Sequence, residues 1–259
     1  MSLVTYEVLG SDHIATISLN RPEALNAVSG ALADELAEAF TRVGADDDVW
    51  VVVLRAEGEK AFCVGADLKE RAAFSVEDFY RNRAQIRGMF AALRSLPQPS
   101  IAAIFGYAQG GGFELALSCD LIVAAQGTKV GLPETRVGLI PAGGGTQLLT
   151  RKLGTARAKD LIFRGRSLDA DEAHSMGLVA EVCEPGEQDD RVLELARELC
   201  KSSPIAVRQA KVAIDGALGD LDEGLDREHS AWEVVIASDD RAEGIAAFVE
   251  KRSPEWKNR

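Results

Sequence analysis

A glutamate follows three consecutive glycines near the middle of the chain. Gly110, Gly111 and Gly112 come shortly after an apolar stretch that ends at Phe105, and Glu114 lies two residues further on. Glycine runs permit close backbone approach. The free N–H groups at a helix N-terminus favour an anion or a developing oxyanion. The segment fits an oxyanion site beside an acid, or tight strand–helix packing with Glu114 as an ordinary first-turn acid.

A second glutamate, Glu134, lies in a similar setting. It follows Pro133 and precedes the glycine-rich run 138–146. Such a residue is commonly a surface acid in a loop. Two carboxyl groups in one site, however, push each other's pKa values apart, so one can act as a base and the other as an acid. The pair predicts acid–base chemistry if the fold brings Glu114 and Glu134 together.

The third candidate segment contains Gly65 and Ala66, which could present a backbone N–H group to a ligand. Asp67 and Lys69 follow, and residue type alone is equally consistent with ordinary surface charges. Cys63 is not expected to be a nucleophile, because no histidine lies near it in the sequence to act as its base.

Composition limits the classes of function. The chain has 259 residues, 46% of them hydrophobic, and a net charge of −12. This acidity argues against a nucleic-acid partner, which requires clustered Lys and Arg. The four cysteines form no C-x-x-C pair and the three histidines are scattered, so neither a disulfide framework nor a metal site is expected. No apolar stretch is long enough to span a membrane, and no signal peptide is recognised. We expect a cytoplasmic protein.

The apolar pattern predicts the elements that would hold these residues. Ser29 resembles a helix N-cap, and helices are expected over 76–96 and 113–118. Strands are expected over residues 5–9, 14–19, 49–54, 100–105 and 121–125. Alternating strands and helices predict an α/β fold with parallel strands and covering helices.

The pattern changes at about residue 191. Helices are expected over residues 192–200, 205–217, 221–237 and 240–251, with no strand among them. We therefore divide the chain into an α/β core, 1–190, and a helical region, 191–259. Leu225, Trp232, Val235 and Ile236 share one face of the third helix, which could pack on the core or on another subunit.

The three candidate segments, in this order, resemble the crotonase superfamily, also called the enoyl-CoA hydratase/isomerase family. The resemblance covers nearly the whole chain. The segments that carry it are Asn20-Arg21-Pro22-Glu23-Ala24-Leu25-Asn26-Ala27, Gly65-Ala66-Asp67-Leu68-Lys69, Gly110-Gly111-Gly112-Phe113-Glu114, Pro133-Glu134, Asp239-Asp240-Arg241-Ala242-Glu243-Gly244 and Phe248-Val249-Glu250-Lys251-Arg252.

This resemblance implies a crotonase-like spiral of ββα units with a C-terminal helical region that forms homotrimers, often paired into hexamers. It implies an acyl-CoA thioester as the substrate, with coenzyme A as part of that substrate and no separate cofactor. The N–H groups of Ala66 and Gly111 would form the oxyanion hole. The implied substrate and CoA contacts are Ala24, Leu25, Ala66, Asp67, Leu68, Lys69, Gly111, Pro141 and Ala142.

The superfamily performs several reactions on one scaffold, so the acids must indicate which reaction applies. Hydratases of the family carry both glutamates, here at Glu114 and Glu134. We expect addition of water across the 2,3 double bond of a trans-2-enoyl-CoA, which yields a 3-hydroxyacyl-CoA. Glu114 would be the base that acts on water, and Glu134 would deliver the proton to the α carbon. An enoyl-CoA isomerase is the alternative on the same scaffold.

Residues 63–72 look like the branch that contains methylglutaconyl-CoA hydratase, a second alternative. One mammalian member of that branch binds RNA through a lysine-rich helix. The matching segment here, 29–48, has one arginine, no lysine and several acids, so we expect no RNA binding.

Ala142 follows Pro141 where the family commonly has glycine, and its methyl group could narrow the acyl pocket.

Overall fold

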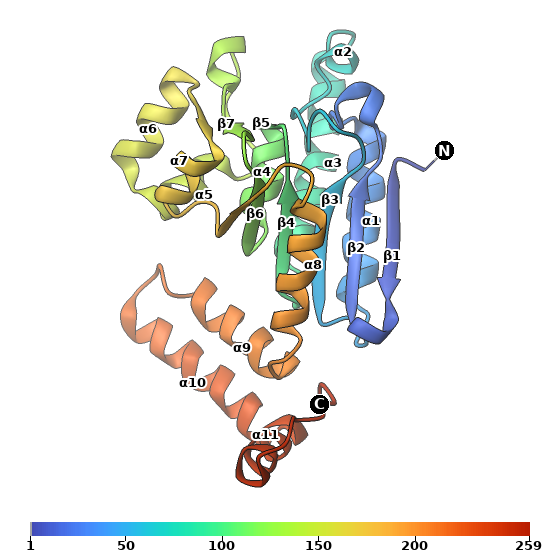
Figure 1. Ribbon diagram of the computed structural model, residues 1–259. Coiled ribbons are helices and arrows are strands. Elements are labelled where there is room, and N and C mark those ends of the chain that lie inside the picture. The colour runs from blue at the N-terminus through green and yellow to red at the C-terminus, as the bar shows by residue number, and fades with distance from the viewer. Residues whose placement is uncertain (1) are drawn as a thin grey trace.

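The computed structural model describes residues 2–259, which form two β-sheets and the helices around them (Figure 1). The larger sheet has the order β1-β2-β3-β4-β6-β9, and the smaller has the order β5-β7-β8. The strands of the larger sheet are β1 (Val4–Leu9), β2 (Ile14–Leu19), β3 (Val51–Ala56), β4 (Ser100–Ile104), β6 (Leu121–Ala125) and β9 (Glu181–Cys183). Those of the smaller sheet are β5 (Tyr107–Gln109), β7 (Lys129–Gly131) and β8 (Ser167–Asp169).

The larger sheet is parallel except for the hairpin of β1 and β2. Its central strands are nearly continuous apolar runs. Since successive side chains of a strand point to opposite sides, both faces of the sheet are apolar there. Val52 and Leu54 face the main core, whereas Val51 and Val53 face a second, smaller core. The continuous apolar runs in the sequence therefore correspond to a sheet covered on both faces.

Different helices cover the two faces. Helices α1 (Gly30–Gly44) and α3 (Val76–Arg94) pack on each other and contribute to the main core. Ser29 caps α1, as predicted, by accepting a hydrogen bond from the N–H of Leu32. Helix α8 (Gln188–Leu199) packs across β3, β4 and β6 on the other face. Its residues Val192, Leu195 and Ala196 fill the second core.

The repeating unit of the spiral places one strand in each sheet and then a helix. Strand β4 enters the larger sheet, β5 enters the smaller, and α4 (Gly111–Ser118) follows. The next unit repeats this with β6, β7 and the helices α5 (Gly145–Leu153) and α6 (Thr155–Arg164). Strand β8, α7 (Ala170–Ser175) and β9 then return the chain to the larger sheet. The predicted α/β fold with a ββα spiral is confirmed.

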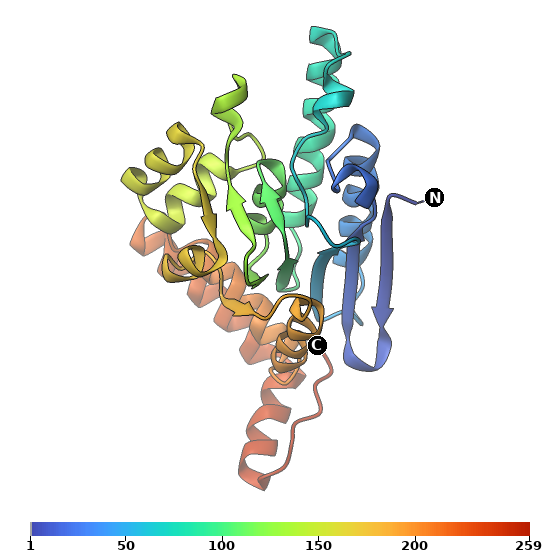
Figure 2. The ribbon, with the colours of Figure 1, turned by 45° about the horizontal axis from the view of Figure 1, so that its top comes forward.

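Three helices extend from one end of the core (Figures 1 and 2): α9 (Pro204–Asp215), α10 (Leu221–Ala237) and α11 (Asp239–Glu250). Lys211 of α9 ties them to the core, since its Nζ lies 2.7 Å from Asp120 and 3.0 Å from the carbonyl oxygen of Gln98. The expected boundary at residue 190 groups α8 with these helices, although α8 packs on the sheet. The extending part thus begins at Pro204. No helix within residues 2–259 is long and apolar enough to cross a membrane.

Candidate active site

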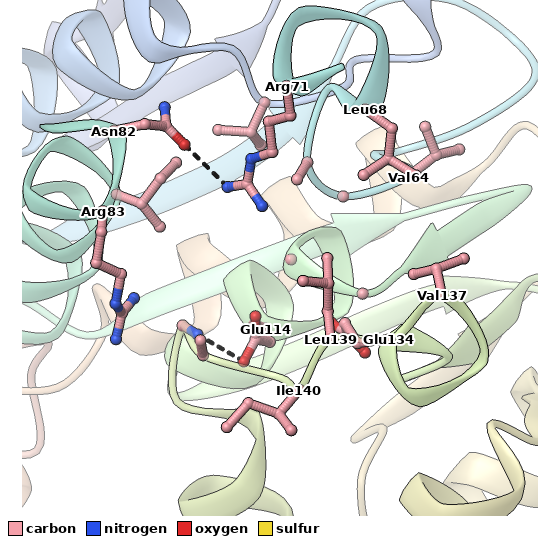
Figure 3. A pocket seen from close by; sticks show the side chains of 18 of the residues that line it. Val64, Leu68, Arg71, Asn82, Arg83, Glu114, Glu134, Val137, Leu139 and Ile140 are labelled. Atoms are coloured by element: carbon pink, nitrogen blue, oxygen red, sulfur yellow. Dashed lines mark hydrogen bonds between the residues drawn. The ribbon is translucent and has the colours of Figure 1, made fainter. Parts of the chain in front are cut away.

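A cavity of about 430 Å³ lies between α3, the start of α4 and the loop after β7 (Figure 3). Its lining comes from four segments, within residues 64–71, 79–90, 110–114 and 133–143, together with Val28. Most of the lining is apolar. Glu114 and Glu134 both face this cavity, so the fold brings the two predicted acids together.

Glu114 is held by backbone donors of the loop after β7. The residue is buried, with only 3% of its surface exposed. Its Oε1 accepts hydrogen bonds from the N–H groups of Gly143 and Gly145, each at 2.7 Å. Burial raises the pKa of Glu114, while these backbone N–H groups oppose the rise. The carboxylate is therefore fixed in orientation, as a general base must be.

The glycines of this loop allow the backbone to approach Glu114. A Cβ atom at Gly143 would overlap the ring of Phe90, and a Cβ at Gly145 would come within 2.9 Å of Glu114 Oε1. Larger residues could not bring both N–H groups to the same oxygen. The glycine-rich run is thus a carboxylate-binding loop and not simply a flexible turn.

Glu134 has a different environment. It begins a short 3₁₀ turn, Glu134–Val137, after Pro133. Its Oε2 is buried and has no hydrogen-bond partner among residues 2–259. Burial raises the pKa of Glu134 to about 7, and the nearby charge of Glu114 adds to the rise. A carboxyl group with this pKa is about half protonated at neutral pH, so it can both hold and release a proton there.

Two backbone N–H groups lie on the wall next to the glutamates. The N–H of Val28 donates to the carbonyl oxygen of Gly65 at 2.7 Å, and the N–H of Asp67 donates to that of Val28 at 3.0 Å. These two hydrogen bonds form a parallel bridge between Val28 and Ala66. In such a bridge the N–H of Ala66 itself points away from Val28. The N–H of Gly111 opens α4, where no intrahelical acceptor exists.

The two segments that carry these N–H groups are in close contact. A Cβ atom at Gly111 would lie 3.8 Å from the nitrogen of Ala66. At Gly112 a Cβ would overlap the carbonyl oxygen of Cys63. The glycines thus let α4 start directly against the 63–66 segment. This geometry places two N–H donors side by side, as stabilisation of an oxyanion requires.

The predicted site residues fall into two groups. Those that line the cavity are Ala66, Leu68, Gly111, Glu114, Glu134 and Ala142. Those that do not are Ala24, Leu25, Asp67, Lys69 and Pro141.

Some residues of the second group have visible structural contacts. The carbonyl oxygen of Leu25 accepts the N–H of Val64, a cavity residue, at 3.2 Å. Asp67 caps α2 (Leu68–Arg71) and forms an ion pair with Arg21 at 3.1 Å. It therefore stabilises the segment around Ala66 without lining the cavity. Lys69 is exposed and Pro141 is buried. Their contact with substrate stays a prediction.

The structure agrees with the expectation for Cys63 and adds further residues to the site. Cys63 is fully buried, and burial raises the pKa of its thiol to about 12, so it is not a thiolate nucleophile. The cavity lining also contains Arg71, Asn82 and Arg83, which nothing in the sequence pattern singles out. They come from α2 and α3, and in the sequence they look like ordinary polar positions on helices.

Known proteins match this chain along nearly its whole length. The family model for enoyl-CoA hydratase/isomerase matches residues 10–259. Mitochondrial methylglutaconyl-CoA hydratase of Homo sapiens is 43% identical over 249 residues, which cover 94% of this chain and 74% of the relative. The crystal structure of an enoyl-CoA hydratase from Bacillus anthracis is 43% identical and has a TM-score of 0.96, with 99% of this chain and 100% of that chain covered. An enoyl-CoA hydratase from Mycobacterium tuberculosis H37Rv has 34% identity and a TM-score of 0.90, with both chains fully covered. The chain therefore belongs to the enoyl-CoA hydratase/isomerase family, within the crotonase superfamily.

Proposed function

We propose that this protein adds water across the 2,3 double bond of a trans-2-enoyl-CoA to give a 3-hydroxyacyl-CoA. The observation that carries the proposal is the pair of glutamates in one cavity with unlike environments. Glu114 is held by two backbone N–H groups, whereas the Oε2 atom of Glu134 is buried without a hydrogen-bond partner within the described part of the chain. Unlike environments divide the roles of base and acid.

The proposed reaction follows from this arrangement. The thioester oxygen accepts the N–H groups of Ala66 and Gly111, which stabilise the enolate that forms when water attacks the β carbon. Loss of one such donor typically costs about 3 kcal/mol of transition-state stabilisation. Glu114 takes a proton from the attacking water, whose oxygen bonds to the β carbon. Glu134 gives its proton to the α carbon, which completes the addition.

The same site could shift a double bond without adding water, as an enoyl-CoA isomerase does. Isomerisation needs one group to carry a proton between two carbons, so a single carboxyl group suffices. The second glutamate favours hydration, because it provides a separate proton donor while the first activates water.

Purified protein can be tested with crotonyl-CoA, whose conjugated thioester absorbance is lost on hydration. We expect saturable loss of absorbance and formation of 3-hydroxybutyryl-CoA. A second assay uses a 3-enoyl-CoA of equal length, with appearance of the conjugated 2-enoyl product as the readout. Faster isomerisation than hydration, or no hydration of short, medium or branched 2-enoyl-CoAs, would contradict the proposal.

We further propose that the protein acts as a homotrimer or hexamer and requires no cofactor or nucleic acid. Support comes from the apolar side chains that α10 and α11 leave exposed. Trp232 is 55% exposed and Phe248 85% exposed, and exposed apolar patches of this kind mark interaction surfaces. Light scattering after gel filtration should give three or six times the chain mass, and Phe248→Glu should lower it. A monomeric wild type at assay concentrations would contradict this proposal.

A further inference from the structure

Glu134 lies on a turn that has little structure of its own. The segment Glu134–Val137 is a single 3₁₀ turn without a side-chain cap, and residues 136–140 are exposed. The hydrogen bonds of a 3₁₀ turn have poorer geometry than those of an α-helix, and such turns are stable only as short pieces. The position of the Glu134 carboxyl group therefore depends on contacts that the turn makes with other elements.

The C-terminus of α6 provides two such contacts. The Oγ1 group of Thr135 donates to the carbonyl oxygen of Ile162 at 2.8 Å. Arg136 donates to the carbonyl oxygen of Arg164 from Nε at 3.0 Å and from Nη2 at 2.8 Å. The last carbonyl groups of a helix lack intrahelical donors and carry partial negative charge, so a hydroxyl group and a guanidinium group are suitable partners. The two residues that follow Glu134 thus tie it to α6.

Gly165 makes room for the second contact. It ends α6 in the left-handed conformation, with φ of 54°. A Cβ atom there would lie 2.8 Å from Nε of Arg136 and 3.0 Å from its Cγ. The arginine side chain therefore packs directly on the glycine, and a larger residue at position 165 would displace it.

Helix α6 is also linked to the other glutamate. It packs on α5 at the edge of the molecule (Figure 1). Gly145, the first residue of α5, donates its N–H to Glu114 at 2.7 Å. The helix pair thus binds the proposed base at the start of α5 and the turn of the proposed acid at the end of α6. Three side chains of α6 are buried and hold it in place: Ala158, Leu161 and Ile162.

We propose that Thr135 and Arg136 are positioning residues, which use α6 to set where the carboxyl group of Glu134 lies relative to Glu114. The anchored turn holds this carboxyl group against Gly110, where a Cβ atom would lie 3.0 Å from Glu134 Oε1 and where Oε2 is buried. A turn released from α6 would carry the carboxyl group toward solvent and away from the α carbon of the substrate. The effect on turnover rests on the proposed hydratase function, whereas the effect on Glu134 itself does not.

The protonation of Glu134 reports its position. Burial raises its pKa to about 7, and the charge of Glu114 adds to the rise. The other charged side chains that line the cavity are Arg71, Arg83 and Arg136. Exposure of the carboxyl group would lower its pKa toward the ordinary value of 4.5. Since a general acid must be protonated to act, the pH at which hydration declines would fall with this pKa.

The first experiment compares Thr135→Val with wild type. Valine has a similar shape and lacks the hydroxyl donor, and Thr135 does not line the cavity. We expect kcat for crotonyl-CoA hydration to fall about 2- to 10-fold, the range for one hydrogen bond, with little change in KM. The midpoint of the alkaline decline in kcat/KM should fall by about one pH unit, a tenfold change in proton affinity.

Thr41→Val is the control for this experiment. The hydroxyl group of Thr41 donates to the carbonyl oxygen of Ala37 within α1 at 2.7 Å, remote from Glu134. Its loss should leave kcat and the pH midpoint as in wild type. A folded Thr135→Val enzyme with the kcat and pH midpoint of Thr41→Val, or with a change in KM alone, would overturn the inference.

The second experiment removes the arginine anchor. Arg136→Met should lower kcat about 10- to 100-fold, the range for hydrogen bonds from a charged group. Arg136→Lys should recover part of the loss, because lysine keeps the charge but not the pair of donors. Because Arg136 also lines the cavity, KM must be measured with kcat. A rise in KM with kcat unchanged would make Arg136 a substrate contact and contradict its positioning role.

The third experiment displaces Arg136 without changing its chemistry. Gly165→Ala should lower kcat and the pH midpoint as Arg136→Met does. Gly177→Ala is the matched control, because Gly177 also has a positive φ, 78°, but no atom lies within 4 Å of an added Cβ. Both variants carry the backbone strain of a left-handed alanine, and only the first displaces the anchor. Identical pH profiles for the two variants would contradict the inference.

A final measurement does not depend on turnover. In protein labelled with ¹³C at the glutamate carboxyl groups, NMR follows the titration of Glu134, whose signal is assigned by its loss in Glu134→Gln. We expect a midpoint near 7 in wild type and about one unit lower in Thr135→Val. An unchanged midpoint in Thr135→Val would overturn the inference. A lowered midpoint in a protein whose wild type hydrates no 2-enoyl-CoA would support the positioning role and remove the hydratase proposal. Should Thr135→Val fail to fold, the comparison of Gly165→Ala with Gly177→Ala decides.

Discussion

The carboxyl groups of Glu114 and Glu134 share one cavity, where burial, assisted by the charge of Glu114, raises the pKa of Glu134 to about 7. The two residues come from different elements, α4 and the 3₁₀ turn after β7. Their environments differ in hydrogen bonding rather than in burial alone. Backbone N–H groups hold Glu114, whereas Oε2 of Glu134 has no partner among the described residues. This asymmetry underlies the proposed division into base and acid.

The raised pKa of Glu134 predicts a pH dependence of stability. The folded pKa of about 7 lies above the ordinary value of 4.5, so between these values the folded state binds the proton more tightly than the unfolded state. The stabilising contribution is complete below about pH 4.5 and is lost as the pH rises through 7. Urea unfolding at pH 5 and pH 8 should show a larger loss of stability for wild type than for Glu134→Gln. Parallel pH profiles would contradict the assignment.

Arg94 is predicted to position Glu114 indirectly. Its Nη1 group donates to the carbonyl oxygen of Gly143 at 2.8 Å, and the N–H of Gly143 donates to Glu114. Removing this hydrogen bond costs about 1 kcal/mol, which corresponds to roughly a fivefold loss of rate. Arg94→Met should lower kcat by that factor with little change in KM, and Arg94→Lys should recover part of it. A change in KM alone would indicate a substrate contact instead.

Gly112 is predicted to be essential for the contact between α4 and the 63–66 segment. A methyl group there would overlap the carbonyl oxygen of Cys63. Gly112→Ala should therefore destabilise the protein by about 1–3 kcal/mol or more and reduce activity, because the N–H groups of Ala66 and Gly111 would separate. The matched control is Gly88→Ala on α3, where no atom lies within 4 Å of the added Cβ.

At Gly88 the same substitution should stabilise the protein by about 0.5–1 kcal/mol, the helix-propensity difference between glycine and alanine. Urea unfolding measures both variants. Equal effects at positions 88 and 112 would show that steric overlap with Cys63 is not the cause.

Ala142 is predicted to limit the acyl pocket. Ala142 lines both the cavity and an adjoining groove between α3 and the loop that contains Gly143. Ala142→Gly should widen the passage and raise the kcat/KM ratio of 2-decenoyl-CoA to crotonyl-CoA by about 10-fold, the lower end of the discrimination typical of a methylene-sized change. An unchanged ratio, with thermal unfolding confirming a folded variant, would show that Ala142 does not control chain length.

The sequence predicts the elements whose signals are local. Strands such as β2 and β3 are continuous apolar runs, and helix α1 carries its own N-cap at Ser29. Strands β5, β7 and β8 have three residues each, which is too short for an alternating pattern to be distinguished from a loop. The smaller sheet therefore becomes visible only in the folded structure.

The sequence likewise indicates the site residues that carry a local signal, but not how the fold brings them together. Glycine runs and nearby acids point to Glu114 and Glu134, but each residue taken alone is equally well explained as an ordinary acid near a turn. Their meeting depends on tertiary contacts between α4 and the loop at Gly143 and Gly145. Arg71 could not be identified from sequence, because an arginine on a short helix is normally a surface charge. Its orientation into the cavity depends on Asn82, eleven residues further along the chain.

The most direct test of the paired-acid mechanism is the kcat for crotonyl-CoA hydration in wild type, Glu114→Gln, Glu134→Gln and the double variant. Each single substitution preserves shape and should lower kcat by about 10²–10⁴-fold. Because the two acids act as one unit, the double variant should lose little more than the slower single variant. A Glu134→Gln or Glu114→Gln enzyme with near wild-type kcat, or losses that multiply fully in the double variant, would contradict the mechanism.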